Sequence, residues 1–186
     1  MNETINTILT RRSVRSYTAA PVAREKIELI LQCGQYAPSA TNRQSWHFTV
    51  VTRRALLDKI SAENKKVLLQ SADEATRARG QDPNFDSFRG APMAIIVSGD
   101  PAVRYTMADC ANAVENMALA ATALGLGSCY LASFKIAMEQ PEGAHLLHEL
   151  KIPEGYFPMF ALSLGYSNEI LGPRQPRKEN AITFIE

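Results

Sequence analysis

The chain has 186 residues, 46% of them hydrophobic and 21% charged, which is the size and composition of an ordinary globular domain with its own core. Twenty basic residues against nineteen acidic ones leave a net charge of +1, so neither nucleic acid nor an anionic membrane is indicated as a partner. Three widely spaced cysteines without a CxxC motif argue against a disulfide framework and a zinc site, and no signal-peptide or membrane-spanning run is present, so we expect a cytoplasmic protein.

The spacing of apolar residues predicts the secondary structure in chain order. Helices are expected over residues 3–9, 21–37, 55–70, 104–124 and 143–150, and strands over 46–52, 93–99, 128–132 and 157–166. The helix over 104–124 is apolar nearly all round apart from Asn112 and Asn116, which predicts a central, buried helix. Residues 71–90 are polar and contain Pro and Gly, so they are expected to form a mobile loop or a short, ragged helix.

Helices and strands alternate irregularly, which favours a single α+β domain over residues 1–186 with a mixed sheet. The last residues, AITFIE, are apolar although the tail before them is polar. Such a chain end is often held against another surface, and a second subunit is one candidate for that surface.

Two basic groups suggest an anion site. The segment RRSVR, Arg11 to Arg15, offers three guanidiniums and a hydroxyl, which suit phosphate oxygens, and Arg174, Arg177 and Lys178 form a second basic group in the tail. RRSVR could equally be a solvated basic turn or a surface site of the kinase-substrate type.

Other patterns in the sequence give weaker evidence of function. Gly125-Leu126-Gly127 lacks a third glycine and follows a helix, so it is no dinucleotide-binding fingerprint. His145 and His148 have no third ligand nearby, so no metal site is expected, and His47 fits a core position. Because no set of side chains looks able to perform difficult chemistry unaided, an enzyme with this sequence would depend on a cofactor.

The segment APSATNRQSWHF, residues 37–48, lies between a predicted helix and a predicted strand. It carries far more hydrogen-bonding side chains than a connecting turn requires. We therefore expect it to hold a polar, flat ligand.

RRSVR, APSATNRQSWHF and the later ENMALAATALGLGSCYL together resemble the nitroreductase-like FMN-dependent flavoproteins, in particular the shorter members, over nearly the whole chain. The resemblance implies an α+β fold with a mixed, mainly antiparallel sheet and a long central helix. It also implies an intertwined homodimer that binds two FMN molecules at its interface.

The resemblance also implies roles for individual residues. The first motif would bind the FMN phosphate and ribityl chain, and the second, from the other subunit, would lie against the isoalloxazine ring. Residues 129–133 would offer main-chain groups near flavin N5 and O4, an Asn in the polar segment would bind the pyrimidine edge, and tail arginines would complete the phosphate site. The implied residues are Arg11, Arg12, Ser13, Arg15, Pro38, Ser39, Ala40, Asn42, Gln44, Asn84, Cys129, Tyr130, Leu131, Ala132, Ser133, Arg174 and Arg177.

Three positions depart from the family pattern. Ser45 stands where a Pro is usual between Gln and Trp, which loosens that turn. Ala132 and Ser133 stand where other members carry Gly or an acidic residue, and this affects the expected N5 contact and substrate preference. Ser87 lies near a position at which some members have a Lys.

The preferred hypothesis is an FMN-dependent oxidoreductase that takes reducing equivalents from NAD(P)H and passes them to nitroaromatic or quinone-type acceptors by a ping-pong mechanism, with no side chain assigned as acid or base. A flavin-binding redox sensor or flavin store without turnover is the alternative. A basic surface for nucleic acid or phosphoprotein is a third hypothesis, which the near-neutral net charge disfavours.

Overall fold

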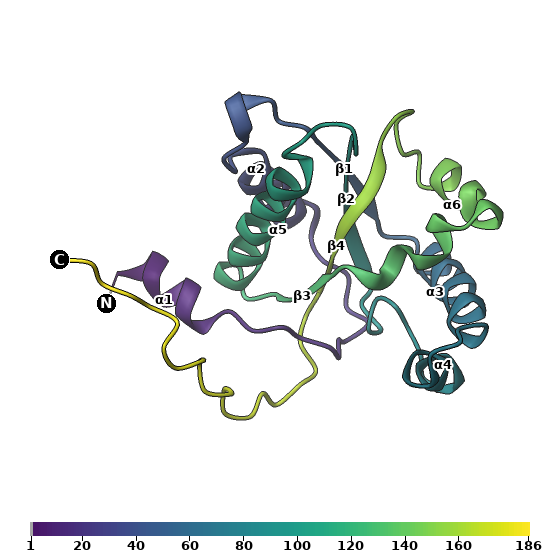
Figure 1. The fold of residues 1–186 in the computed structure, drawn as a ribbon. Helices are drawn as coiled ribbons and strands as arrows, with labels where there is room; N and C mark the ends of the chain where they lie inside the picture. Colours follow the sequence, from purple (N-terminus) through teal and green to yellow (C-terminus); the bar gives the residue numbers. More distant parts are fainter. Residues whose placement is uncertain (1) are drawn as a thin grey trace.

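A four-stranded sheet forms the centre of the computed structural model, which describes residues 2–186 (Figure 1). The strands lie in the order β1-β2-β4-β3, and all neighbours pair antiparallel. An isolated parallel bridge between Ser13 and Ser128 adds the RRSVR segment to the outer edge of β3. The α+β class with a mainly antiparallel sheet is therefore confirmed. The strands are β1 (Trp46–Val51), β2 (Met93–Gly99), β3 (Gly127–Leu131) and β4 (Phe157–Gly165).

Helices cover both faces of the sheet (Figure 1). On one face lie α2 (Arg24–Gln35) and α5 (Thr106–Ala123), and on the other lie α3 (Arg54–Leu69), α4 (Glu74–Gln81) and α6 (Ala144–Glu149). The helix α1 (Glu3–Thr10) stands apart from the sheet beside the C-terminal tail. Three short 3₁₀ helices complete the fold: η1 (Ala40–Asn42), η2 (Ser133–Glu139) and η3 (Pro141–Gly143).

Each face of the sheet has its own hydrophobic core. Ile95 and Val97 of β2 pack with Met117 of α5, whereas Ile96 faces the other way and packs with Leu57 of α3. All seven residues of β2 are buried because it lies between two strands and two helical layers. This explains why the sequence of β2 is a continuous apolar run and not an alternating one.

Most predicted elements agree with the structure to within three residues. The polar segment 71–90 contains a regular helix, α4, which begins where the Asp73 side chain accepts a hydrogen bond from the Thr76 N–H at 2.7 Å. The expectation for α5 was wrong in one respect. Its buried residues face the sheet and α2, but Met107 and Ala108 in its first turn are exposed, whereas Asp109, although charged, is fully enclosed.

Two apolar surfaces of the chain remain uncovered. Helix α1 has no buried residue, and the side chains of Ile8 and Leu9 are half exposed. In the tail, Ile182, Phe184 and Ile185 are 77%, 83% and 96% exposed. Exposed apolar residues gathered in this way indicate an interaction surface. Across residues 2–186, no helix is both long and apolar enough to cross a membrane.

Candidate cofactor site

The RRSVR segment is fixed to the edge of β3 by its central valine. The Val14 N–H donates to the Ser128 carbonyl at 2.8 Å, and the Val14 side chain is buried against Gly127. A Cβ at Gly127 would lie 2.9 Å from both methyl groups of Val14, so only glycine admits this approach. With Val14 turned inward, Arg12 and Ser13 precede it and Arg15 follows it on the open side.

Four arginines gather where this segment meets the C-terminal tail. The Arg12 guanidinium donates to the Gly172 carbonyl at 3.0 Å, and Arg174 donates to the Arg11 carbonyl at 2.6 Å. Partial desolvation, followed by the positive charges of Arg12, Arg177 and Arg11, lowers the pKa of Arg174. Arg11 also pairs with Glu115 of α5 at 3.1 Å. The remaining positive charge suits a bound dianion such as a phosphate group.

The loop between α2 and β1 is conformationally strained. Thr41, Asn42 and Gln44 adopt φ angles of 53°, 55° and 49°, in the left-handed region that non-glycine residues seldom occupy. The Ser39 hydroxyl accepts a hydrogen bond from the Gln44 N–H at 3.0 Å, and the side chains of Thr41, Asn42 and Gln44 are exposed. Strain of this kind is typical of ligand-binding loops.

Helix α5 anchors this loop. The buried Asp109 carboxylate accepts hydrogen bonds from the Ala40 N–H at 3.0 Å and from the Ser45 hydroxyl at 2.8 Å. Asn112, three residues further along, donates to the Pro38 carbonyl at 3.2 Å. The loop therefore sits at the N-terminal end of α5.

Within one chain, the loop and the RRSVR segment lie toward opposite ends of α5. Asp109, which holds the loop, belongs to the first turn of α5, whereas Ser128, which pairs with Ser13, follows the C-terminal end of α5. The helix from Asp109 to Ala123 alone spans about 21 Å at 1.5 Å per residue. The main chains of the two motifs therefore lie apart in a single subunit, although the Arg11 side chain reaches Glu115 in the middle of α5, about 9 Å along the helix from Asp109.

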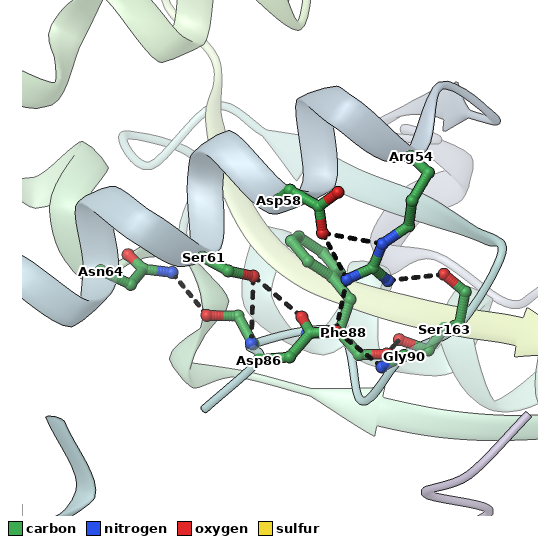
Figure 2. Close-up of polar contacts among 10 residues, drawn as sticks. Arg54, Asp58, Ser61, Asn64, Asp86, Phe88, Gly90 and Ser163 are labelled. Carbon is green, nitrogen blue, oxygen red and sulfur yellow. Dashed lines mark hydrogen bonds and ion pairs between the residues drawn. The ribbon is translucent and has the colours of Figure 1, made fainter. Parts of the chain in front are cut away.

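The loop before β2 is fixed by the partly buried polar network in Figure 2. The Asp86 carboxylate accepts hydrogen bonds from the Phe88 and Gly90 N–H groups at 2.7 Å each, and from Ser61 and Arg54 of α3. Burial alone would raise the pKa of Asp86, but these hydrogen bonds outweigh it and leave the pKa lowered. The network ties residues 86–90 to α3.

A second part of the network reaches η2. The fully buried Asn64 donates to the Ser87 hydroxyl at 2.9 Å and to the Phe134 carbonyl, and accepts from the Ala137 N–H at 2.8 Å. Ser87 thus points into the protein and not toward a ligand. Asn84, by contrast, is exposed.

The strand β3 leads into the remaining predicted residues. Cys129 and Leu131 are buried, while the Tyr130 ring packs at a tilt against Phe160 with ring centroids 4.9 Å apart, and burial raises the pKa of Tyr130 to about 12. The next two residues, Ala132 and Ser133, are exposed at the start of η2. Residues 129–131 therefore lie on an outer strand of the sheet, and their main-chain contact with a flavin stays a prediction.

Two residues of interest were missed by sequence reasoning. Asp109 is a charged residue within an apolar helical pattern, which is the signal that could have revealed it. Arg89 is exposed with a φ of 60°, and its charge, with that of Arg15, opposes the rise in the Cys129 pKa that burial causes. Arg89 lies in the polar segment 71–90, for which the sequence predicted only a mobile loop or a short, ragged helix.

An antiparallel sheet between two helical layers, with an arginine cluster at one edge and a strained polar loop, defines an α+β protein with a candidate anion site. Comparison identifies the family. The nitroreductase family model matches residues 8–166, and the chain belongs to that family.

Individual relatives agree with this membership. A protein of Archaeoglobus fulgidus named as an NADH dehydrogenase/NAD(P)H nitroreductase is 37% identical over 175 residues, which cover 91% of this chain and 88% of the relative. A nitroreductase from Bacteroides fragilis, whose crystal structure contains FMN, is 35% identical with a TM-score of 0.93 over 100% of both chains. A second FMN-bound nitroreductase, from Desulfitobacterium hafniense, is 30% identical with a TM-score of 0.92, also over 100% of both chains.

Proposed function

We propose that this protein is an FMN-dependent oxidoreductase that uses NAD(P)H to reduce nitroaromatic or quinone-type acceptors. The arginine cluster of Arg11, Arg12, Arg174 and Arg177 is the observation that carries the proposal, since these charges repel one another without an anion between them. The FMN-bound relatives of Bacteroides and Desulfitobacterium, with the same fold over their whole length, support FMN as the source of that anion.

Residues from several segments would hold the cofactor. The arginine cluster and Ser13 would bind the phosphate, and Arg15 would lie nearer the ribityl chain. Asn84 would bind the pyrimidine edge, and the main chain of residues 129–133 would approach N5 and O4. The loop residues Pro38, Ser39, Ala40, Asn42 and Gln44 would lie against the ring.

The loop would come from a second subunit. Because the loop and RRSVR lie toward opposite ends of α5 in one chain, a single subunit offers only part of the site. The exposed apolar residues of α1 and of the tail support a homodimer in which these surfaces are covered. Two equivalent FMN sites would then form, each completed by the other chain.

The protein side chains would bind and orient the flavin and the substrates, and they would not themselves react. The redox chemistry is supplied by bound FMN, which can accept a hydride from NAD(P)H and return electrons to an acceptor. Burial raises the pKa of the Cys110 thiol to about 12, and it also raises the pKa of Cys129, so neither is a thiolate at neutral pH. The reductant and the acceptor would use the same site in turn, which is a ping-pong mechanism.

Initial-rate kinetics test this proposal. The protein is reconstituted with FMN, and rates are measured at several NADH or NADPH concentrations with p-benzoquinone or nitrobenzoate as acceptor. Parallel double-reciprocal lines are expected for a ping-pong reaction. FMN binding without turnover with either nucleotide would contradict the enzyme proposal and favour a flavin sensor or store.

A further inference from the structure

Asp109 is an unusual residue for its position. Its side chain is only 2% exposed within the apolar helix α5, and none of the described ion pairs includes it. Its location in the first turn of α5 places the carboxylate near the positive end of the helix dipole. A buried carboxylate is costly unless its hydrogen bonds are satisfied, so its two partners require explanation.

Both partners belong to the strained loop. The carboxylate accepts from the Ala40 N–H at 3.0 Å and from the Ser45 hydroxyl at 2.8 Å, and these residues flank Thr41, Asn42 and Gln44 with their left-handed φ angles. Each left-handed non-glycine residue costs about 1–2 kcal/mol of conformational energy. The Asp109 carboxylate is thus hydrogen-bonded to both ends of the loop. It holds the loop in its strained conformation.

Close packing beneath the loop supports the same role. A Cβ at Gly99 would lie 2.4 Å from the Thr106 side chain and 2.8 Å from the Ser45 carbonyl. The start of α5 and the end of the loop are therefore packed so closely around Gly99 that no larger side chain fits there. Ser45, which replaces the Pro expected at this position, supplies the hydroxyl that a Pro could not.

We propose that Asp109 is a positioning residue that presets the loop over residues 39–45, and that through this loop it controls flavin binding in the site of the partner subunit. The inference rests on the proposed function, because it takes the ligand to be FMN and the site to be shared. Its new content is that the first turn of α5 in one chain governs the ring end of the other chain's site. The arginine cluster, in which Arg11 pairs with Glu115 in the middle of α5, serves the chain's own site.

Three substitutions and a control examine the hydrogen bonds. Asp109→Ala removes both acceptors, and Ser45→Ala removes one donor. Asp109→Asn can still accept from the Ala40 N–H and can donate to the Ser45 oxygen. The control is Asn116→Ala, because Asn116 also projects from α5 but donates to the Cys33 carbonyl at 3.1 Å, outside the loop.

FMN affinity is measured by fluorescence quenching, and thermal stability is measured without flavin. We expect the dissociation constant for FMN to rise about tenfold in Asp109→Ala and about threefold in Ser45→Ala, as the loss of hydrogen bonds to a charged group predicts. Asp109→Asn should restore binding to within about threefold of the wild type, and Asn116→Ala should match the wild type. Equal affinity in all variants would overturn the inference.

Mixed dimers test whether the effect crosses the subunit interface. Asp109→Ala chains are co-expressed with chains carrying Arg12→Gln and Arg174→Gln, each with its own tag, and the mixed dimer is purified on both tags. One of its two sites then has an intact loop and an intact arginine cluster. We expect about half a dimer's normal FMN content at a concentration where each parent dimer holds little.

Mixed dimers that hold no more FMN than their parents would overturn the inference, since a general folding role or a role within one subunit predicts that result. If Asp109→Ala fails to fold, Ser45→Ala replaces it in the mixed dimer. A different result would contradict the proposed function, namely that the wild-type protein itself does not bind FMN.

Discussion

The Arg174 guanidinium donates a hydrogen bond to the Arg11 carbonyl at 2.6 Å, which joins the C-terminal tail to the end of α1 across 163 positions of sequence. Partial desolvation, followed by the positive charges of the neighbouring guanidiniums, lowers the pKa of Arg174. Such an arrangement is favourable once an anion is bound between the charges.

This arrangement predicts a phosphate-specific loss of binding in Arg174→Gln. We expect the affinity for FMN to fall about tenfold, since a hydrogen bond between charged groups contributes roughly 1.5–3 kcal/mol. The affinity for riboflavin, which lacks the phosphate, should change little. Titration of both flavins measures the difference, with substitution of the exposed, uncharged neighbour, Gln175→Ala, as a control in the same tail. Equal losses for FMN and riboflavin would place Arg174 away from the phosphate.

The network around Asp86 predicts a pH-dependent contribution to stability. The folded-state pKa of Asp86 is lowered, so its contribution is fully present above the unfolded pKa of about 3.9 and is lost as the pH falls through the lower folded value. Asp86→Ala should lower the free energy of unfolding by about 3 kcal/mol at pH 7, because it leaves Arg54 and two main-chain N–H groups without their acceptor. The penalty should shrink in acid below pH 4.

The matched control is Asp58→Ala. Asp58 also pairs with Arg54, at 2.6 Å, but it is an exposed i,i+4 partner on α3, so its removal should cost less than 1 kcal/mol. Urea unfolding at pH 7 and at pH 3 measures both variants. Similar penalties for the two substitutions would show that Asp86 is not the centre of the network in Figure 2.

Arg89 and Gly90 provide a reciprocal test of backbone strain. Their φ angles are 60° and 73°, and a Cβ at Gly90 would meet nothing within 4 Å. Arg89→Gly should therefore raise the free energy of unfolding by about 0.5–1 kcal/mol, and Gly90→Ala should lower it by about 1 kcal/mol. Thermal unfolding of the two variants checks this prediction. Changes of the same sign in both would show that strain does not decide stability at this turn.

The exposed face of α1 predicts the assembly. Leu9→Glu should convert a dimer, with twice the chain mass of 20.5 kDa, into a monomer, because a charge would have to be buried unpaired at the interface. The monomer should also lose FMN. The control is Leu69→Glu at the end of α3, where a 42% exposed leucine lies far from α1 in the fold. Light scattering after gel filtration measures the masses, and a dimeric Leu9→Glu protein with bound FMN would contradict the shared site.

Local patterns in the sequence predicted most of the fold. The run MAIIVSG predicts the central strand β2 because burial on both faces needs continuous apolar residues. The 3₁₀ helix η2 could not be predicted, since its main chain is held by Asn64, which is 73 positions away from Ala137. Propensities act over a few residues and carry no information on such distant partners.

The same limit applies to the candidate site. RRSVR and the loop after α2 are visible in the sequence because their arginines and amides are concentrated in short segments. Asp109 is one carboxylate in a helix, and its importance arises from the fold, which brings Ala40 and Ser45 to it. The resemblance identified residues that would touch the ligand, but not those that would hold these residues in place.

The visible absorbance spectrum of the freshly purified protein, before and after NADH or NADPH is added without oxygen, tests the central claim most directly. We predict the absorbance bands of an oxidised flavin, followed by rapid bleaching with one of the two nucleotides. A colourless protein that also fails to bind added FMN would contradict the proposed cofactor, and a flavin that neither nucleotide bleaches would contradict the proposed reaction.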